Sequence, residues 1–204
     1  MNTHARLRTD PKVKLLEAAR RVLLECGYAG LSTRAVAAQA GTQMSQIRYH
    51  FGSKEGMILA LFEYMNDALV NRQSVTFTDP DLSLAEKWRR SCDYLDDDLA
   101  SGYVRVLQEL MTAGYSNAAI GEVVRAALGR WRDLLISLAR EFAQRHATAG
   151  SFEAEELAAL IAAVFLGAEA CILVGQESDL MPIRRALRKL GDLMDRLETS
   201  VDPE

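Results

Sequence analysis

Apolar residues recur at steps of three and four along almost the whole chain, which is the pattern of amphipathic helices. The first stripe follows Asp10 and Pro11, a helix-capping residue and a proline suited to the first turn, and Gly27 supplies its end. Only four prolines occur, and runs of β-branched residues that would indicate strands are absent. The pattern predicts an all-α fold.

Two short helices follow. The first is capped by Ser32 or Thr33 and ended by Gly41, and the second runs over about residues 42–50. Two helices that cross at a steep angle need a small residue where they touch, a glycine at the turn and an apolar anchor on the second helix. Ala37, Gly41 and Ile47 meet these three needs. The segment therefore predicts a helix-turn-helix, completed to a three-helix head by the first helix.

A larger helical body is predicted after this head. A further helix begins at Ser53 and is long enough to link head and body. Residues 76–83 interrupt the periodicity, and Ser83 with Glu86 forms a capping-box pattern for the next helix. That helix ends at about residue 100. Four later periodic segments cover residues 103–115, 117–147, 153–176 and 182–200.

Residues 157–175 are apolar apart from Glu169 and approach the length of a membrane span. The presence of Glu169 inside the segment, the acidic residues just before it and the lack of a second such segment argue against a span. A helix rich in alanine and glycine packs more often between other helices. We expect no membrane segment.

The charge is unevenly distributed. The chain carries a net charge of −4, but residues 1–72 hold ten Lys/Arg against six Asp/Glu, and the remainder holds fourteen against twenty-two. A basic region on an acidic chain is expected to meet an anion. The widely spaced Cys26, Cys92 and Cys171 and the absence of a leader pattern predict a reduced, cytoplasmic protein without a metal site.

Polar side chains crowd the second short helix opposite Met44 and Ile47. Such groups suit a nucleic acid. In double-stranded DNA, amide and guanidinium groups hydrogen-bond to base edges, whereas cations, hydroxyls and helix N-termini contact phosphates. We expect base or adjacent backbone contacts from Gln43, Ser45, Gln46 and Arg48, and mainly phosphate contacts from Thr33, Arg34, Tyr49, His50 and Lys54. Taken singly, Gln46 and Arg48 also fit a solvated face, and His50 fits packing against Phe51.

The chain resembles the TetR family of bacterial transcriptional regulators in residues 27–62, which read GYAGLSTRAVAAQAGTQMSQIRYHFGSKEGMILALF. The Gly-Tyr after the first helix, the Thr-Arg that opens the second, the Ala-Gly turn and the Tyr-His-Phe-Gly-Ser-Lys-Glu run stand where the family has them. The resemblance covers residues 10–65 well. It implies a homodimer whose third helices enter the major groove of a double-stranded DNA operator, and a body in which a small molecule shifts the spacing of the heads.

Two positions differ from the usual family pattern. Valine and serine commonly follow the turn glycine, whereas Thr42 and Gln43 follow Gly41 here, so we expect Thr42 to cap the next helix. The family also often has an aromatic residue where Arg48 stands. Both differences lie on the DNA-facing helix and leave the operator sequence open.

We expect a helix-turn-helix DNA-binding domain over residues 1–52 and a helical ligand-binding and dimerisation domain over 53–204. The function implied is that of a ligand-responsive regulator, a repressor that binds a palindromic operator as a homodimer and is released by an inducer. A helical binding or scaffold protein with the same fold but no operator is the alternative. The sequence has no phosphate loop, nucleophile elbow or catalytic cluster, so we expect neither an enzyme nor a cofactor.

Aromatic and long apolar side chains of the body are candidates for the inducer site, although the same residues at helical spacing also fit an ordinary core. These are Trp88, Tyr94, Tyr103, Leu107, Met111, Trp131, Phe142 and Phe165. The last two helices usually form the dimer in the family. Their apolar seams predict an interface at Phe165, Ile172, Ile183, Leu187, Leu190 and Met194.

Overall fold

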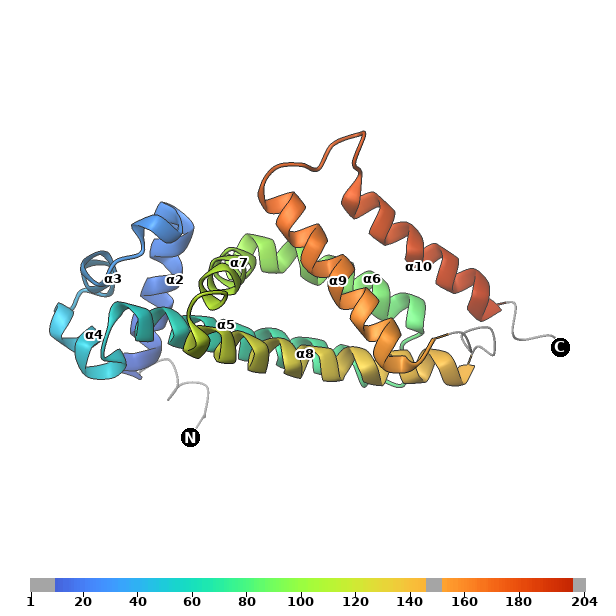
Figure 1. The fold of residues 1–204 in the computed structure, drawn as a ribbon, viewed down its shortest axis with the longest axis horizontal. Coiled ribbons are helices and arrows are strands. Elements are labelled where there is room, and N and C mark those ends of the chain that lie inside the picture. Colours follow the sequence, from blue (N-terminus) through green and yellow to red (C-terminus); the bar gives the residue numbers. More distant parts are fainter. Residues whose placement is uncertain (1–9, 146–151, 200–204) are drawn as a thin grey trace. The chain divides into compact units, whose positions relative to one another are not determined.

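The computed structural model describes residues 10–145 and 152–199, and the regular structure in these ranges is helical apart from one bridge between Ser178 and Met181 (Figure 1). The expected all-α fold is confirmed. In chain order the helices are α2 Pro11–Gly30, α3 Thr33–Ala40, α4 Met44–Phe51, α5 Lys54–Phe77, α6 Leu84–Ser101, α7 Tyr103–Gly114, α8 Ala118–Arg145, α9 Ala154–Leu173 and α10 Ile183–Thr199.

Local capping chemistry sets several helix ends. The Asp10 carboxylate accepts a hydrogen bond from the Lys12 N–H at 2.8 Å, and Ser32 Oγ accepts one from the Ala35 N–H at 3.2 Å. Ser32 is therefore the cap of α3. Gly27 takes a φ of 70° and kinks α2, but helical residues continue beyond it to Gly30, so the helix does not end where the sequence pattern predicts.

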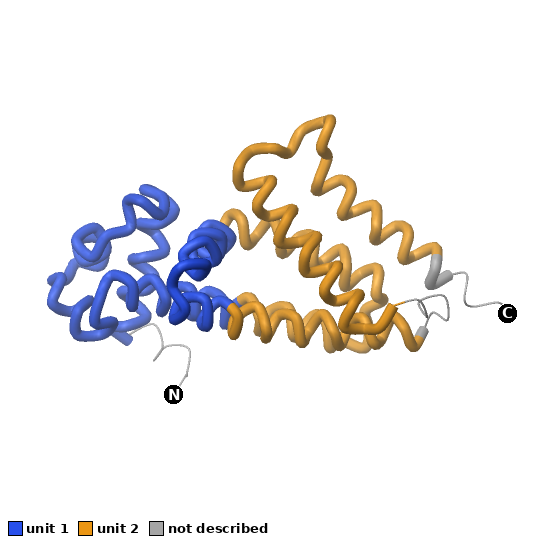
Figure 2. Tube along the Cα trace, in the orientation of Figure 1, with its two compact units in different colours: residues 1–68, 101–124 blue, residues 69–100, 125–204 orange. Residues whose placement is uncertain are grey.

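The chain forms two compact units (Figure 2). One contains the residues up to Ala68 together with Ser101–Val124, and the other contains Leu69–Ala100 and the residues from Arg125 onward. The boundaries fall inside α5 and α8, so these long helices contribute to both units. This division differs from a boundary at residue 52 because the first half of α5 and all of α7 pack with α2. The functional division into residues 1–52 and 53–204 stays a prediction.

The first unit is joined by contacts among α2, α5 and α7. The rings of Phe62 and Tyr103 stack with their centroids 5.7 Å apart. The Tyr103 hydroxyl donates to Asn66 Oδ1 at 2.8 Å, and the Tyr64 hydroxyl donates to Glu17 Oε1 at 2.8 Å. Because both hydroxyls find acceptors, the two tyrosine rings pack against their neighbours without leaving a polar group unbonded.

The second unit has an aromatic centre. Phe165 of α9 meets Trp88 of α6 with ring centroids 5.5 Å apart, and Trp131 of α8 with centroids 6.4 Å apart. The Trp88 indole N–H donates to the Leu187 carbonyl of α10 at 2.7 Å. These contacts tie four helices to one buried cluster.

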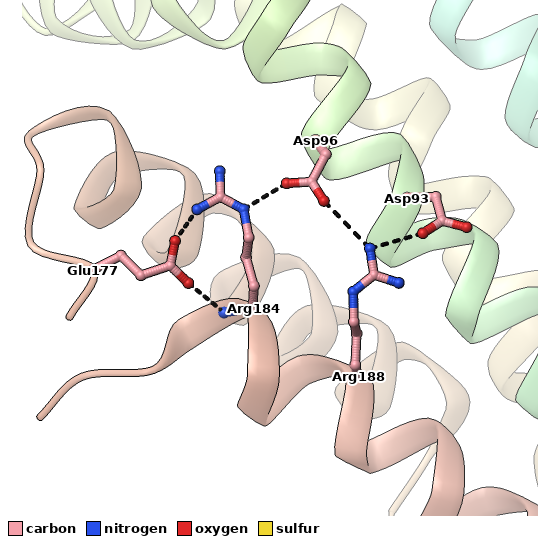
Figure 3. Close-up of polar contacts among 5 residues, drawn as sticks. All are labelled: Asp93, Asp96, Glu177, Arg184 and Arg188. Carbon is pink, nitrogen blue, oxygen red and sulfur yellow. Dashed lines mark hydrogen bonds and ion pairs between the residues drawn. The ribbon is translucent and has the colours of Figure 1, made fainter. Parts of the chain in front are cut away.

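Ion pairs join α10 to α6 and to Glu177, which lies in the segment between α9 and α10 (Figure 3). Arg184 contacts Asp96 at 2.5 Å and also pairs with Glu177, while Arg188 contacts Asp93 at 2.8 Å and Asp96 at 3.3 Å. These side chains are partly exposed, so each pair contributes at most about 1 kcal/mol. The charged face of α10 therefore lies partly against α6.

The apolar helix α9 buries only one face. Ala158, Phe165 and Ala168 are buried, whereas Leu160 and Val164 on the other side are about half exposed. Among the described residues α9 is the one helix with the length and hydropathy of a membrane span. Its buried face and the ionisable Glu169 within it are typical of a core helix in a helical bundle.

Candidate functional site

The turn between α3 and α4 is built by Gly41. This residue has φ 63° and ψ 41°, the left-handed conformation that glycine adopts without strain. Its N–H donates to the Ala38 carbonyl at 3.1 Å, and the Thr42 N–H donates to the Ala37 carbonyl at 2.9 Å. These bonds satisfy the last carbonyls of α3 and turn the chain into α4.

The amino end of α4 differs from the expectation. Gln43, not Thr42, is the N-cap, because its backbone is extended (φ −93°, ψ 151°) and its carbonyl accepts a hydrogen bond from the Gln46 N–H of the first turn at 3.0 Å. The Gln43 side chain does not cap the helix; its Oε1 instead accepts a long hydrogen bond of 3.5 Å from Ser45 Oγ. The polar side chains at this end are thus directed to each other and to solvent.

A single residue anchors α4. Ile47 is 1% exposed and is the buried residue of this helix. Met44, expected on the inner side with it, is 55% exposed, so that expectation is wrong. The remaining surface carries the polar set at Gln43, Ser45, Gln46, Arg48 and Tyr49, all of which are exposed.

The basic side chains around this surface are available to an anion. Arg34 on α3, Arg48 on α4 and Lys54 at the start of α5 are exposed, and none of them enters a salt bridge with another described residue. The arginines of the second unit that lie near carboxylates, such as Arg184, are instead paired. Cations without partners next to a helix N-terminus are suited to phosphate.

Two of the predicted phosphate contacts are partly enclosed. Thr33 is half-buried at the first position of α3. His50 is half-buried between its neighbours, with its ring 5.0 Å from Tyr49 and 6.1 Å from Phe51. This geometry supports the packing alternative for His50, and its contact with phosphate stays a prediction.

The aromatic and apolar candidates for the inducer site divide between the units. Tyr103 and Leu107 are buried in the first unit, where Met111 is half-buried. Trp88, Trp131 and Phe165 meet in the second unit. Two others of that unit lie outside this group: Phe142 is half-buried on α8, and Tyr94 lies beneath the Arg72 guanidinium at 4.2 Å.

A buried acidic pair lies in the second unit and was missed by the sequence analysis. Asp98 pairs with Arg72 at 2.8 Å, and burial raises the pKa of its carboxyl to about 6 although Arg72 opposes the change. Burial also raises the pKa of Glu169 to about 8, and the charge of Asp98 adds to the effect. Glu169 Oε2 is enclosed and has no hydrogen-bond partner in the described structure. A lone glutamate inside an apolar helix was the available signal.

The residues expected at a dimer interface lie mainly in the core of one chain. Phe165 and Leu187 are buried in the aromatic cluster, and Ile172, Ile183 and Met194 pack against it. Their seams are covered by α6, through Trp88, Cys92 and Leu95. Leu190 differs, because it is 42% exposed.

Comparison with known proteins agrees with the geometry of α3 and α4. Residues 15–61 match the family described as bacterial regulatory proteins, tetR family. These residues therefore have the sequence pattern of the TetR family. The matched region contains α3, the Gly41 turn and α4, whereas α6 to α10 lie beyond it.

A curated relative shares this TetR region. The HTH-type transcriptional repressor AcnR of Corynebacterium glutamicum is 40% identical over 53 residues, which are 26% of this chain and 28% of AcnR. The match thus spans little more than a quarter of either protein.

Solved structures resemble the whole chain. A transcriptional regulator from Saccharomonospora viridis in complex with choline has a TM-score of 0.70 at 19% identity, over 92% of this chain and 96% of that one. FadR from Bacillus subtilis in complex with stearoyl-CoA has a TM-score of 0.68 at 18% identity, over 87% and 96%. At these identities the likeness shows that the TetR fold extends through the body.

Proposed function

We propose that the protein is a transcriptional regulator that binds double-stranded DNA through α4 as a homodimer and is released from an operator by a small molecule. The observation that carries the proposal is the composition of α4 and its surroundings. One buried residue, Ile47, anchors the helix, and its exposed side chains are polar and flanked by unpaired cations. A helix of this kind fits the major groove, where its side chains meet base-edge donors and acceptors.

The exposed residues have distinct roles in this proposal. Gln43, Ser45, Gln46 and Arg48 contact bases or the adjacent backbone, with the guanidinium of Arg48 suited to guanine and the glutamines suited to adenine. Arg34, Lys54, Tyr49, Thr33 and, where its packing allows, His50 contact phosphates.

Homodimer formation is supported by exposed apolar residues on α9 and α10. Leu160, Val164, Leu190 and Leu193 are each between 42% and 52% exposed, which is high for large aliphatic side chains on neighbouring elements of one unit. Exposed apolar surface of this kind marks an interaction site. A two-fold pairing of the same faces would present two copies of α4 to a palindrome.

Control by a small molecule is supported by the ligands of the similar structures. The S. viridis regulator was solved with choline and B. subtilis FadR with stearoyl-CoA. Repression is proposed from the name of AcnR, of which only 28% is matched. A scaffold protein with the same fold but no operator is the second candidate, and it predicts no sequence-selective DNA binding.

Fluorescence anisotropy on DNA tests the proposal. A labelled duplex from upstream of the chain's own gene and a random duplex of equal length are titrated at about 50 mM and about 200 mM salt, a range over which six to ten phosphate contacts lose about a thousandfold or more in affinity. Lys54→Ala is expected to weaken binding to both duplexes evenly, whereas Arg48→Ala reduces the preference for the specific one. Arg132→Ala is the control, since Arg132 is an exposed arginine of the second unit that pairs with Asp133. Salt-independent or absent binding to both duplexes contradicts the proposal.

A further inference from the structure

Glu169 is a buried carboxyl group without a partner. The residue is only 9% exposed and lies near the carboxyl end of the apolar helix α9. Its side chain makes no hydrogen bond or ion pair with any described residue, and its Oε2 is fully enclosed. A buried polar group of this kind is unfavourable for folding and calls for an explanation in function.

The cation near Glu169 is already paired with another carboxylate. Asp98, the charge that acts on Glu169, is held by Arg72 at 2.8 Å. The Arg72 guanidinium is already shared with Asp97 at 3.5 Å and with the face of the Tyr94 ring. Asp97 is mostly solvent-exposed, so water screens its charge. The ionised form of Glu169 would therefore face the negative charge of Asp98 without a positive group of its own.

The surroundings of Glu169 favour an organic group over a metal ion. Phe165, one turn earlier on α9, and Ile172, on the following turn, both belong to the cluster around Trp88. In the part of the chain that the structure describes, no group of three or more His, Cys, Asp or Glu residues could hold a metal. Aromatic rings attract ammonium groups, and the apolar cluster suits a hydrocarbon body. An anion would be repelled by Asp98 and would further disfavour the ionised form of Glu169.

We propose that Glu169 and Asp98 bind the ammonium group of a small organic cation whose apolar part contacts the cluster of Trp88 and Phe165. That this cation acts as the effector of a DNA-binding regulator rests on the proposed function. The cation site itself does not.

Binding is coupled to a proton at this site. Burial raises the pKa of Glu169 to about 8, so that the carboxyl holds its proton near neutral pH when no cation is present. An ammonium group favours the carboxylate, and the proton leaves to solvent. The charged groups that act here are Asp98 from α6, which favours the protonated form of Glu169, and Arg72 from α5, which is engaged by Asp98. The affinity for a permanently charged cation is therefore expected to fall by roughly tenfold or more between about pH 8.5 and about pH 6.5.

Isothermal titration calorimetry on the full chain tests the site. The probes are hexylammonium, hexyltrimethylammonium, hexan-1-ol and hexanoate, which share a chain and differ in charge. The two ammonium compounds are expected to bind more tightly than the alcohol and the carboxylate. They are expected to release up to one proton at neutral pH, measured in buffers of different ionisation enthalpy.

Matched variants assign the effect to Glu169. Glu169→Gln keeps the shape of the side chain and is expected to weaken ammonium binding about tenfold or more without changing the affinity for the alcohol. Asp98→Asn is expected to weaken ammonium binding as well, through a second carboxylate. Glu122→Gln is the control, because Glu122 is exposed on α8 and outside the site. Circular dichroism confirms that each variant is folded.

The outcomes separate the site from the regulator. The cation site is overturned if no ammonium compound binds, if hexan-1-ol or hexanoate binds as tightly, or if Glu169→Gln binds ammonium unchanged. DNA affinity is measured in parallel with and without the tightest cation. Loss of cation binding with intact operator binding leaves the proposed function standing. Cation binding that does not change operator affinity keeps the site and refutes its role as an effector site.

Discussion

Replacing Glu169 by glutamine is expected to flatten the dependence of the protein's stability on pH. The wild-type carboxyl has its pKa raised by burial from 4.5 to about 8. Below pH 4.5 the group is protonated in both the folded and unfolded states and has no effect on stability. Above that pH the unfolded chain loses the proton while the folded chain keeps it, so stability falls as the pH rises and the full loss is reached above pH 8.

The magnitude follows from the same two pKa values. Each pH unit between them lowers the free energy of unfolding by about 1.4 kcal/mol, so the whole interval corresponds to about 5 kcal/mol. Asp98 titrates in the same direction, but its pKa is raised only from 3.8 to about 6. Between about pH 6.5 and about pH 8, Glu169 therefore changes the free energy of unfolding more than Asp98 does. It lowers this free energy by roughly 2 kcal/mol over that range.

Urea unfolding of wild type and Glu169→Gln at several pH values measures this difference. Protein concentration is held constant, because dimer formation would make stability depend on it. The wild type is expected to lose roughly 2 kcal/mol more than Glu169→Gln between about pH 6.5 and about pH 8. Groups elsewhere that titrate in this range are present in both proteins and cancel. Equal pH dependence in the two proteins would refute the burial of an unpaired carboxyl at this position.

Three further predictions concern the anchor, the ion pairs and the exposed apolar face. Ile47→Ala is expected to lower the free energy of unfolding by about 2–4 kcal/mol in urea titrations, because it empties the buried contact of α4; a change below about 1 kcal/mol would contradict the anchor. Asp96→Ala removes a partner of both Arg184 and Arg188, so about 1 kcal/mol is expected to be lost at low salt and less near 1 M salt, and a salt-independent loss would argue against an electrostatic cause. Leu193→Glu is expected to shift the protein to monomers in sedimentation velocity, and an unchanged dimer would place the interface elsewhere.

Features set by neighbouring residues could be predicted from the sequence. The cap at Asp10, the turn at Gly41 and the anchor at Ile47 each depend on a few adjacent positions, and the structure has all three. The predicted cap of α4 was one residue too early, because the backbone of the turn decides which carbonyl accepts the first hydrogen bond of the helix, and here it is that of Gln43. Sequence spacing does not show where in a turn the helical conformation begins.

Features set by distant segments could not be predicted. The periodicity of α9 and α10 indicates that Phe165 and Leu187 are inside, but not that α6 covers them rather than a second chain. The sequence shows that Glu169 interrupts an apolar helix, yet its lack of a partner depends on where Arg72 and Asp98 lie. Side-chain partners far apart in the chain become visible only in the folded structure.

Selection of binding sites from random double-stranded DNA tests most directly whether α4 reads DNA in a two-fold assembly. Wild-type protein is expected to enrich an inverted repeat with half-sites one helical turn or more apart. Arg48→Ala is expected to lose the preference at one equivalent position in each half-site while keeping the spacing. An enriched sequence without two-fold symmetry, an unchanged preference in Arg48→Ala, or no enrichment at all would contradict the account.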